Sequence, residues 1–132
     1  MITASPVRAS IELEHADPHD FRAAWTISPG DPIFRGHYPG FPIYPGVCLI
    51  ESVHQVALAH ASANGRSMVL VTIENTRFRR PVFPGDRITV EGRTTSVGDG
   101  YFQCTATVQS VRDDGEPCEA ARVRLRYASQ TR

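Results

Sequence analysis

The sequence predicts an α+β domain in which an antiparallel sheet wraps around one long, buried helix. Residues 47–63 form a helix-length segment with almost no polar face, and a helix that is apolar on most sides is a buried one. Several strand-like segments follow it, and tight-turn sequences join the last three of them. The length of 132 residues fits one domain over 1–132, with loose termini at 1–9 and 128–132.

The composition excludes several classes of protein. The chain is 41% apolar and 21% charged, which is typical of a globular domain rather than a disordered one. Its 14 basic residues, all of them arginine, balance 14 acidic residues, so the charge footprint of a nucleic-acid binder is absent. The first ten residues lack the apolar core of a signal peptide, and no run approaches the roughly 20 apolar residues of a membrane helix. We therefore expect a cytoplasmic protein with no membrane partner.

Two short strands come first and a long loop follows them. Residues 10–14 and 21–27 alternate apolar and polar side chains, which is the pattern of a strand with one covered face. The loop over 29–46 contains too much proline for a helix or a central strand. Its prolines are Pro29, Pro32, Pro39, Pro42 and Pro45. Loops of this length in compact domains often carry function.

The helix over 47–63 has clear boundary signals. Pro45 lies near its start, where the missing N–H would have no partner within the helix. Asn64-Gly65 is typical of the residues that end a helix. We expect this helix to be surrounded rather than laid on a surface. Five strands are predicted after it, at 68–73, 78–82, 87–97, 101–111 and 119–127.

Glu51 is the strongest candidate for chemistry from its position alone. It lies within the apolar helix, and a buried carboxylate is costly unless it is paired. Desolvation would favour its neutral form and make it a usable proton donor or acceptor near neutral pH. A structural carboxylate, paired with an arginine or bonded to Gln55 one turn later, is the competing interpretation.

Three further candidates lie at the junction of loop and helix. His37 stands in the loop between aromatic residues, and histidine is the commonest general base at neutral pH. The free N–H groups of Gly46 and Val47 at the helix start would suit a carbonyl or oxyanion. A surface histidine and an ordinary Pro-Gly turn are the alternatives.

This segment resembles the (3R)-hydroxyacyl-[acyl carrier protein] dehydratases, the FabZ-like hotdog-fold family of type II fatty acid synthesis. The shared pattern is Gly36-His37-Tyr38-Pro39-Gly40, Pro42, Pro45-Gly46-Val47, Glu51 and Gln55. A second block also matches, with Arg77-Phe78-Arg79-Arg80-Pro81-Val82 followed by Pro84-Gly85-Asp86. The resemblance runs from about residue 27 to residue 127, most of the chain.

The resemblance implies a single hotdog fold and a dimer in which two sheets join. His37 of one protomer would face Glu51 of its partner. His37 would take the C2 proton of a 3-hydroxyacyl thioester, and Glu51 would protonate the departing hydroxyl. The N–H of Gly46, alone or with that of Val47, would polarise the thioester carbonyl. The resemblance implies no metal or organic cofactor. The substrate would be carried on the phosphopantetheine of acyl carrier protein.

Other residues are expected to serve the substrate or the carrier. Phe41, Tyr44 and Phe83 could line a substrate tunnel, although core packing suits them equally, and Gln55 belongs to the substrate-binding set. Arg77, Arg79 and Arg80 are expected on a solvated strand edge. The family's carrier protein is acidic, so these arginines could contact it or the phosphate of its phosphopantetheine.

Two departures from the family pattern bear on the pathway. The family's usual N-terminal segment is replaced by Ser10-Ile11-Glu12-Leu13-Glu14-His15, and Ser52-Val53-His54 stands where small apolar residues are common. A dedicated pathway, such as polyketide or specialised lipid assembly, therefore fits as well as housekeeping fatty acid synthesis. The dimer could assemble further into a trimer of dimers.

The remaining histidines and cysteines are expected to be structural. His54 and His60 are six residues apart on the helix and cannot share a face, so we expect packed or partly exposed side chains. The run His15-Ala16-Asp17-Pro18-His19 lacks helical metal-site geometry because of its proline. Cys48, Cys104 and Cys118 lack the spacing of a metal site and are expected as buried free thiols.

Three functions remain open from the sequence. The first is a hydro-lyase that acts on 3-hydroxyacyl-carrier thioesters. The second is another thioester enzyme on the same fold, a thioesterase or an enoyl-CoA hydratase, because Glu51 and Gln55 could position a water molecule. The third is a hotdog subunit without catalysis that binds the acyl carrier or completes a heterodimer, which the pair His37 and Glu51 argues against.

Overall fold

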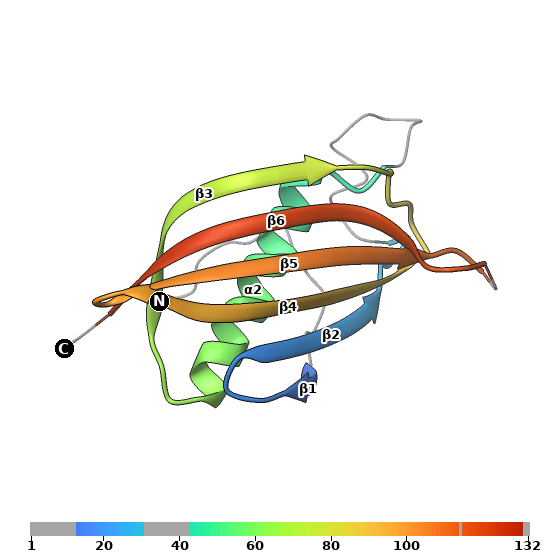
Figure 1. The fold of residues 1–132 in the computed structure, drawn as a ribbon. Coiled ribbons are helices and arrows are strands. Elements are labelled where there is room, and N and C mark those ends of the chain that lie inside the picture. The colour runs from blue at the N-terminus through green and yellow to red at the C-terminus, as the bar shows by residue number, and fades with distance from the viewer. Residues whose placement is uncertain (1–12, 31–42, 114, 131–132) are drawn as a thin grey trace.

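A six-stranded antiparallel sheet curves around one long helix in the computed structural model, which describes residues 13–30, 43–113 and 115–130 (Figure 1). The helix α2 spans Gly46–Ala63. The strands are β1 (Leu13–Ala16), β2 (Asp20–Thr26), β3 (Met68–Phe78), β4 (Arg87–Gly98), β5 (Tyr101–Val111) and β6 (Cys118–Ser129). Their order across the sheet is β1-β2-β4-β5-β6-β3. The predicted α+β class and the sheet wrapped around a helix are confirmed.

The helix α2 begins and ends where the sequence signals place it. Pro45 is the N-cap residue with an extended backbone, and Asn64 is the C-cap. Gly65 follows with φ at 71°, a left-handed conformation that glycine adopts without steric cost. The amide of Asn64 donates to the carbonyls of His60 and Ala61, which closes the last turn.

Among the described residues, the sheet covers one side of α2 and leaves the opposite face partly exposed. The buried face of α2 packs on the concave side of the sheet and contacts every strand. Its buried residues are Cys48, Leu49, Ser52, Val53, Val56, Ala57, His60 and Ala61. On the opposite face Val47 is 63% exposed, and Glu51, His54, Gln55 and Leu58 are only partly buried.

The strand β3 replaces two strands that the sequence analysis predicted separately, at 68–73 and 78–82. It runs unbroken along β6 from Met68 to Phe78 and forms one edge of the sheet. Irregular register at 70–72 and 73–75 disturbs the period-two pattern and explains why the sequence suggested a break. Beyond it, Val82 makes only an isolated bridge with Tyr44.

The C-terminal end is better ordered than the sequence suggested. Strand β6 continues through Ser129, whose amide donates to the carbonyl of Gly100 at 2.6 Å. The amide of Gln130 donates to the carbonyl of Ser67 at 2.8 Å. Residues 128–130 are therefore tied to two neighbouring turns, and the prediction of a loose end from residue 128 is wrong.

The core holds two titratable groups that make the fold sensitive to alkali. Cys104 on β5 and Tyr127 on β6 are fully buried. Burial raises the pKa of the Cys104 thiol from 9.0 to about 12. Burial also raises the pKa of the Tyr127 phenol well above its ordinary value, and the charges of Cys104 and Glu51 add to the effect. Both groups therefore keep their protons in the folded chain at pH values where the unfolded chain loses them.

We expect the free energy of unfolding to fall as the pH rises from 9 toward 12. Above pH 9 the unfolded chain binds fewer protons than the folded chain, so each group removes up to about 1.4 kcal/mol per pH unit. Urea denaturation between about pH 8 and pH 11 measures this slope. Cys104→Ala should flatten it, whereas Cys118→Ala, at a half-buried thiol, should leave it unchanged. Equal slopes in the two variants would contradict the assignment to Cys104.

Candidate active site

The start of α2 leaves two amide groups outside the helical hydrogen-bond ladder. The amides of Cys48 and Leu49 both donate to the carbonyl of Pro45, at 2.9 and 3.3 Å. The ladder therefore begins at Cys48, and the N–H groups of Gly46 and Val47 precede it. Within the described residues, no side chain caps this end. Two N–H donors at the positive end of a helix dipole can bind a carbonyl oxygen or an anion.

Gly46 is in close contact with Phe78 at the end of β3. A Cβ atom added to Gly46 would lie 2.7 Å from Cζ of Phe78, and two more ring atoms would lie at 3.0 and 3.1 Å. Glycine therefore lets the ring lie close to the helix start, and a larger residue here would need the ring to move. The second motif block, at 77–82, thus contacts the first motif block through Phe78 and Gly46.

A groove of about 440 Å³ opens where these two blocks meet. Its wall includes Tyr44, Gly46 and Leu49 from the helix side and Phe78 and Arg80 from the strand side. The ring of Phe78 is half exposed, so this aromatic residue forms a surface rather than part of the core. The groove is mainly apolar with arginine at its rim, which suits a ligand with an apolar body and an anionic end.

Glu51 lies one turn into α2, on the side of the helix that the sheet leaves partly open. It is half-buried rather than fully buried. The Gln55 side-chain amide donates to a Glu51 carboxylate oxygen, with Nε2 and Oε1 3.0 Å apart. The contact that the sequence analysis considered between these residues therefore exists. It fixes one carboxyl oxygen on the partly buried side of the helix.

His54 belongs to the same open face and is bound to the sheet. Its Nδ1 lies 2.8 Å from the hydroxyl oxygen of Tyr127 on β6. The two rings are stacked, with centroids 5.7 Å apart and planes 9° from parallel. Burial lowers the pKa of the His54 imidazole, against the opposing effect of the nearby Glu51 carboxylate. The expectation of a packed His54 is consistent with this contact. Its partner Tyr127 could not be predicted from local sequence, because 73 residues separate His54 from Tyr127.

The other predicted site residues differ in burial, and two of them lie outside the described part of the chain. Tyr44 belongs to the core at 3% exposure, although it also lines the groove, and its amide donates to the carbonyl of Val82 at 2.7 Å. Val47 is exposed beside the groove. His37 and Phe41 lie outside the described residues. The geometry therefore brings Gly46 and Tyr44 together with Arg79 and Arg80, and the relation of His37 to Glu51 remains a prediction.

The three arginines of the second block differ in their contacts. Arg77 lies within the edge strand β3, paired with Arg122 in the register of β6, and is exposed. Arg79 forms an ion pair with Glu119. Arg80 is exposed and lines the groove. The prediction of a solvated strand edge is confirmed for Arg77, while Arg79 and Arg80 follow the strand.

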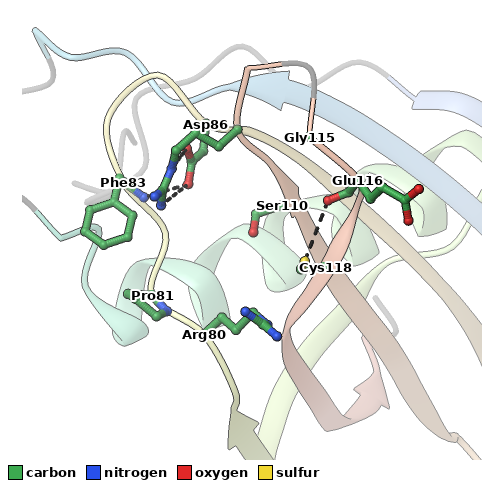
Figure 2. Close-up of a pocket in the computed structure, with 9 residues that line it drawn as sticks. Arg80, Pro81, Phe83, Asp86, Ser110, Gly115, Glu116 and Cys118 are labelled. Carbon is green, nitrogen blue, oxygen red and sulfur yellow. Dashed lines mark hydrogen bonds and ion pairs between the residues drawn. The ribbon is translucent and has the colours of Figure 1, made fainter.

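Phe83 lies in a second pocket, of about 330 Å³, and not among the residues lining the groove (Figure 2). The guanidinium of Arg112 lies 4.1 Å from the Phe83 ring centre and binds the buried Asp86 carboxylate at 3.1 Å. The other Asp86 oxygen accepts from the amide of Phe83 at 2.9 Å. These contacts hold the Pro84-Gly85-Asp86 turn, so the motif block has a structural role here. A place for Phe83 in the same wall as Tyr44 is not supported.

The remaining histidine and cysteine predictions have mixed outcomes. His60 is buried, and its Nε2 lies 2.6 Å from the carbonyl oxygen of Asp17, as expected for a packed histidine. Cys48 and Cys104 are buried free thiols, but Cys118 is only partly buried and lies in the second pocket. Across the described residues, no three His, Cys, Asp or Glu side chains are grouped to hold a metal ion. In the same part of the chain, no helix has the length and apolar character needed to cross a membrane.

Comparison with protein families matches residues 13–114 to the ApeI-like model, described as ApeI dehydratase. A FabZ 3-hydroxyacyl-[acyl-carrier-protein] dehydratase of Yersinia enterocolitica is 37% identical over 118 residues, covering 76% of this chain and 70% of the relative. The FabZ protein of a Wolbachia strain from Drosophila simulans is 38% identical over 93 residues. That match covers 66% of this chain and 65% of the relative, and only 58% of the Thermus thermophilus FabZ is covered.

Solved structures share the fold at low sequence identity. A hypothetical thioesterase protein of Streptococcus pneumoniae with coenzyme A superposes with a TM-score of 0.74 at 11% identity, over 92% of this chain and 86% of the other. The dehydratase heterocomplex ApeI:P of Xenorhabdus doucetiae has a TM-score of 0.67 at 19% identity, over 91% and 99%. These likenesses support a single hotdog fold. The family match over residues 13–114, together with the Yersinia relative, shows that the chain belongs to the ApeI-like dehydratases, among the FabZ-like hotdog-fold proteins that its motifs resemble.

Proposed function

We propose that the chain is a hydro-lyase that removes water from a 3-hydroxyacyl thioester on acyl carrier protein and gives the trans-2-enoyl thioester. The observation that carries the proposal is Glu51, a half-buried carboxyl one turn from the first two N–H groups of α2, those of Gly46 and Val47, in a chain of a dehydratase family. The acid, the carbonyl site and the groove lie on neighbouring parts of one helix end. In an elimination next to a thioester, an acid protonates the departing hydroxyl, an N–H donor polarises the carbonyl, and a groove holds the substrate.

The proposed reaction is an acid–base elimination. His37 takes the proton from C2, the C2–H electron pair becomes the double bond to C3, and the C3–O bond breaks. Glu51 gives its proton to the departing hydroxyl, which leaves as water. The N–H of Gly46, alone or with that of Val47, polarises the thioester carbonyl and stabilises the charge that develops on its oxygen. Both proton transfers are made by side chains, so the step needs no cofactor.

A second copy of the chain is part of the proposal. Edge strand β3 exposes Val69, Val71, Ile73 and Phe78, and Val47 is exposed on α2. An apolar edge strand is a template for pairing with another strand. We expect β3 of two protomers to pair, joining the sheets and covering the open face of α2. His37 of one protomer would then face Glu51 of the partner, with a trimer of dimers as a further possible assembly.

The partner that delivers the substrate is proposed to be acyl carrier protein. The exposed guanidinium groups of Arg77 and Arg80, with Arg79, lie at and beyond the end of β3, and Arg80 borders the groove. Arginine binds phosphate in a bidentate manner, so this block suits the phosphopantetheine phosphate and an acidic carrier surface. The apolar wall with Tyr44 and Phe78 suits an acyl chain.

The test is product analysis by mass spectrometry, with 3-hydroxyacyl-carrier protein of several chain lengths as substrate. Loss of the mass of water from the thioester by the native chain, and not by His37→Ala, supports the dehydratase. Release of free acid and free thiol would instead identify a thioesterase. This is the second candidate because Glu51 and Gln55, joined by a hydrogen bond, could position a hydrolytic water molecule. An unaltered thioester with retained carrier binding would identify a subunit without catalysis. Parallel reactions with 3-hydroxyacyl-CoA and enoyl-CoA test the hydratase direction.

Gly46→Ala offers a test of the carbonyl site. The added methyl must displace the Phe78 ring, 2.7 Å away, from the groove. We expect kcat/KM to fall by about tenfold or more, because the N–H donor and the groove wall move. Thermal stability should stay level or rise, because alanine favours helix over glycine by about 1 kcal/mol.

The double variant Gly46→Ala/Phe78→Ala is the matched control, because the methyl then has room. Partial recovery of kcat/KM in this double variant would assign the loss to the ring contact. Full activity in Gly46→Ala alone would contradict a role for this close approach.

A further inference from the structure

His54 is held by two independent contacts to one residue of the sheet. Its Nδ1 is within hydrogen-bond distance of the Tyr127 hydroxyl, at 2.8 Å, and its ring stacks on the Tyr127 ring at 9°. The hydrogen bond fixes the direction of the imidazole edge, and the stacking fixes its plane. Tyr127 itself is 0% exposed and pairs with Phe102 on β5 and Leu70 on β3. A histidine clamped in this way presents its Nε2 edge in one fixed orientation.

The proton positions of this pair follow from burial. Burial raises the pKa of Tyr127, so its hydroxyl keeps its proton, and burial lowers the pKa of His54, so its imidazole stays neutral. Among the described residues, the hydrogen-bond partner of the Tyr127 hydroxyl is Nδ1 of His54. With the hydroxyl protonated and the imidazole neutral, the O–H group can donate to Nδ1, and the imidazole then carries its proton on Nε2.

The charged and titratable groups around His54 are few in the described part of the chain. Glu51 lies one turn away on the same helix, and its charge acts on both His54 and Tyr127. Cys104 of β5 contributes to the surroundings of Tyr127. Arg126 lies over the ring of Tyr101, 5.0 Å from its centre. From β3, the residue paired with Tyr127 is the apolar Leu70.

We propose that His54, oriented by Tyr127, is a positioning residue for Glu51 that keeps this acid flanked by a neutral imidazole. This inference rests on the proposed function, in which Glu51 must carry a proton to the departing hydroxyl. A protonated His54 would place a positive charge one turn from the carboxyl and favour loss of the proton that the reaction needs. Tyr127 opposes this, because its hydroxyl bonds to the neutral form of the imidazole. The contact thus couples a strand of the sheet to the acid on the helix.

The experiment measures two quantities in the full-length protein as it is purified. The first is the dependence of kcat/KM on pH with 3-hydroxyacyl-carrier substrate. The second is the titration of the His54 imidazole by NMR, with its signal assigned from the spectrum of His54→Asn. The NMR titration separates His54 from His37, whose own protonation also lowers the rate at acid pH.

Three variants define the expected result. Tyr127→Phe removes the hydroxyl and keeps the ring, so the His54 titration and the acid limb of the profile should both move up by about 0.5 to 1 pH unit, which corresponds to one hydrogen bond. His54→Asn retains an acceptor for Tyr127 and cannot titrate, so it should keep activity to lower pH than the native chain. Tyr101→Phe makes the same chemical change at an exposed tyrosine and should move neither quantity.

The outcomes separate this inference from the proposed function. An active native chain in which Tyr127→Phe and His54→Asn both retain the native acid limb overturns the role of His54 alone. A shift of the His54 titration without any shift of the acid limb overturns it as well. A native chain that leaves every hydroxyacyl thioester intact overturns the proposed function, and the positioning role with it.

Discussion

Glu51→Gln should lower kcat/KM for dehydration by about 10² to 10⁴-fold while the fold remains intact. The substitution removes the only proton that the side chain can give, and it changes the shape of the side chain very little. Its amide oxygen can still accept the hydrogen bond from Gln55, which now joins Nε2 to Oε1 at 3.0 Å. Steady-state kinetics with the carrier-bound substrate, together with a thermal unfolding scan, measure the two effects.

The matched control is Glu91→Gln on β4. Glu91 is exposed and forms an ion pair with Arg22, and it alternates with the inward-facing Val90. The same chemical change there should alter neither turnover nor carrier binding. A second variant, Glu51→Asp, keeps an acid on a shorter side chain and should give an intermediate rate. Near-native turnover in Glu51→Gln would remove this residue from the proton-donor role, whatever the product analysis gives.

The helix could be predicted from the sequence with nearly its observed limits because its signals are local. The apolar segment, Pro45 before it and Asn64-Gly65 after it all act within one turn of the chain. Strand β5 was predicted with the bounds it has in the structure, since Gly98, Gly100 and the turn at 112–115 delimit it on both sides. Periodicity and turn chemistry determine such elements without knowledge of their neighbours.

The features that the sequence could not give are those set by distant partners. The irregular register of β3 depends on β6, so its continuity from Met68 to Phe78 was invisible in its own pattern. Tyr127 ends a strand that the sequence predicts at 119–127, but its bond to His54 joins residues 73 positions apart. The placement of Phe83 under Arg112 likewise depends on Asp86, which holds both. The motifs identified Glu51 and Gly46, while the contacts that orient them come from tertiary packing.

Gly92→Ala should be the most destabilising single methyl addition in the described chain, lowering the free energy of unfolding by about 2–4 kcal/mol. Gly92 lies in β4 between Phe21 of β2 and Ala106 of β5. A Cβ atom there would meet Cζ of Phe21 at 2.5 Å, the carbonyl oxygen of Thr105 at 2.7 Å and Cβ of Ala106 at 2.9 Å. Real Cβ atoms do not approach other atoms this closely, so the strands or the ring must move.

Thermal and urea unfolding measure this cost, with Gly30→Ala as the control. Among the described residues, a Cβ atom at Gly30 would meet the Ser28 hydroxyl oxygen at an ordinary contact distance of 3.7 Å, so that variant should keep native stability. The double variant Phe21→Leu/Gly92→Ala should recover only part of the loss. Its smaller side chain removes the ring clash, but the Thr105 oxygen belongs to the backbone of a paired strand and cannot turn away.

The same substitution should also reach the proposed active site through the helix. The Phe21 ring contacts the His60 ring, with centroids 5.1 Å apart, and His60 is buried near the end of α2. Moving Phe21 therefore shifts the support of the helix that carries Glu51 and His54. We expect folded Gly92→Ala, assayed well below its melting temperature, to lose turnover more than carrier binding. If it instead folds with native stability and turnover, the close packing of β2, β4 and β5 around Gly92 does not determine how α2 sits in the sheet.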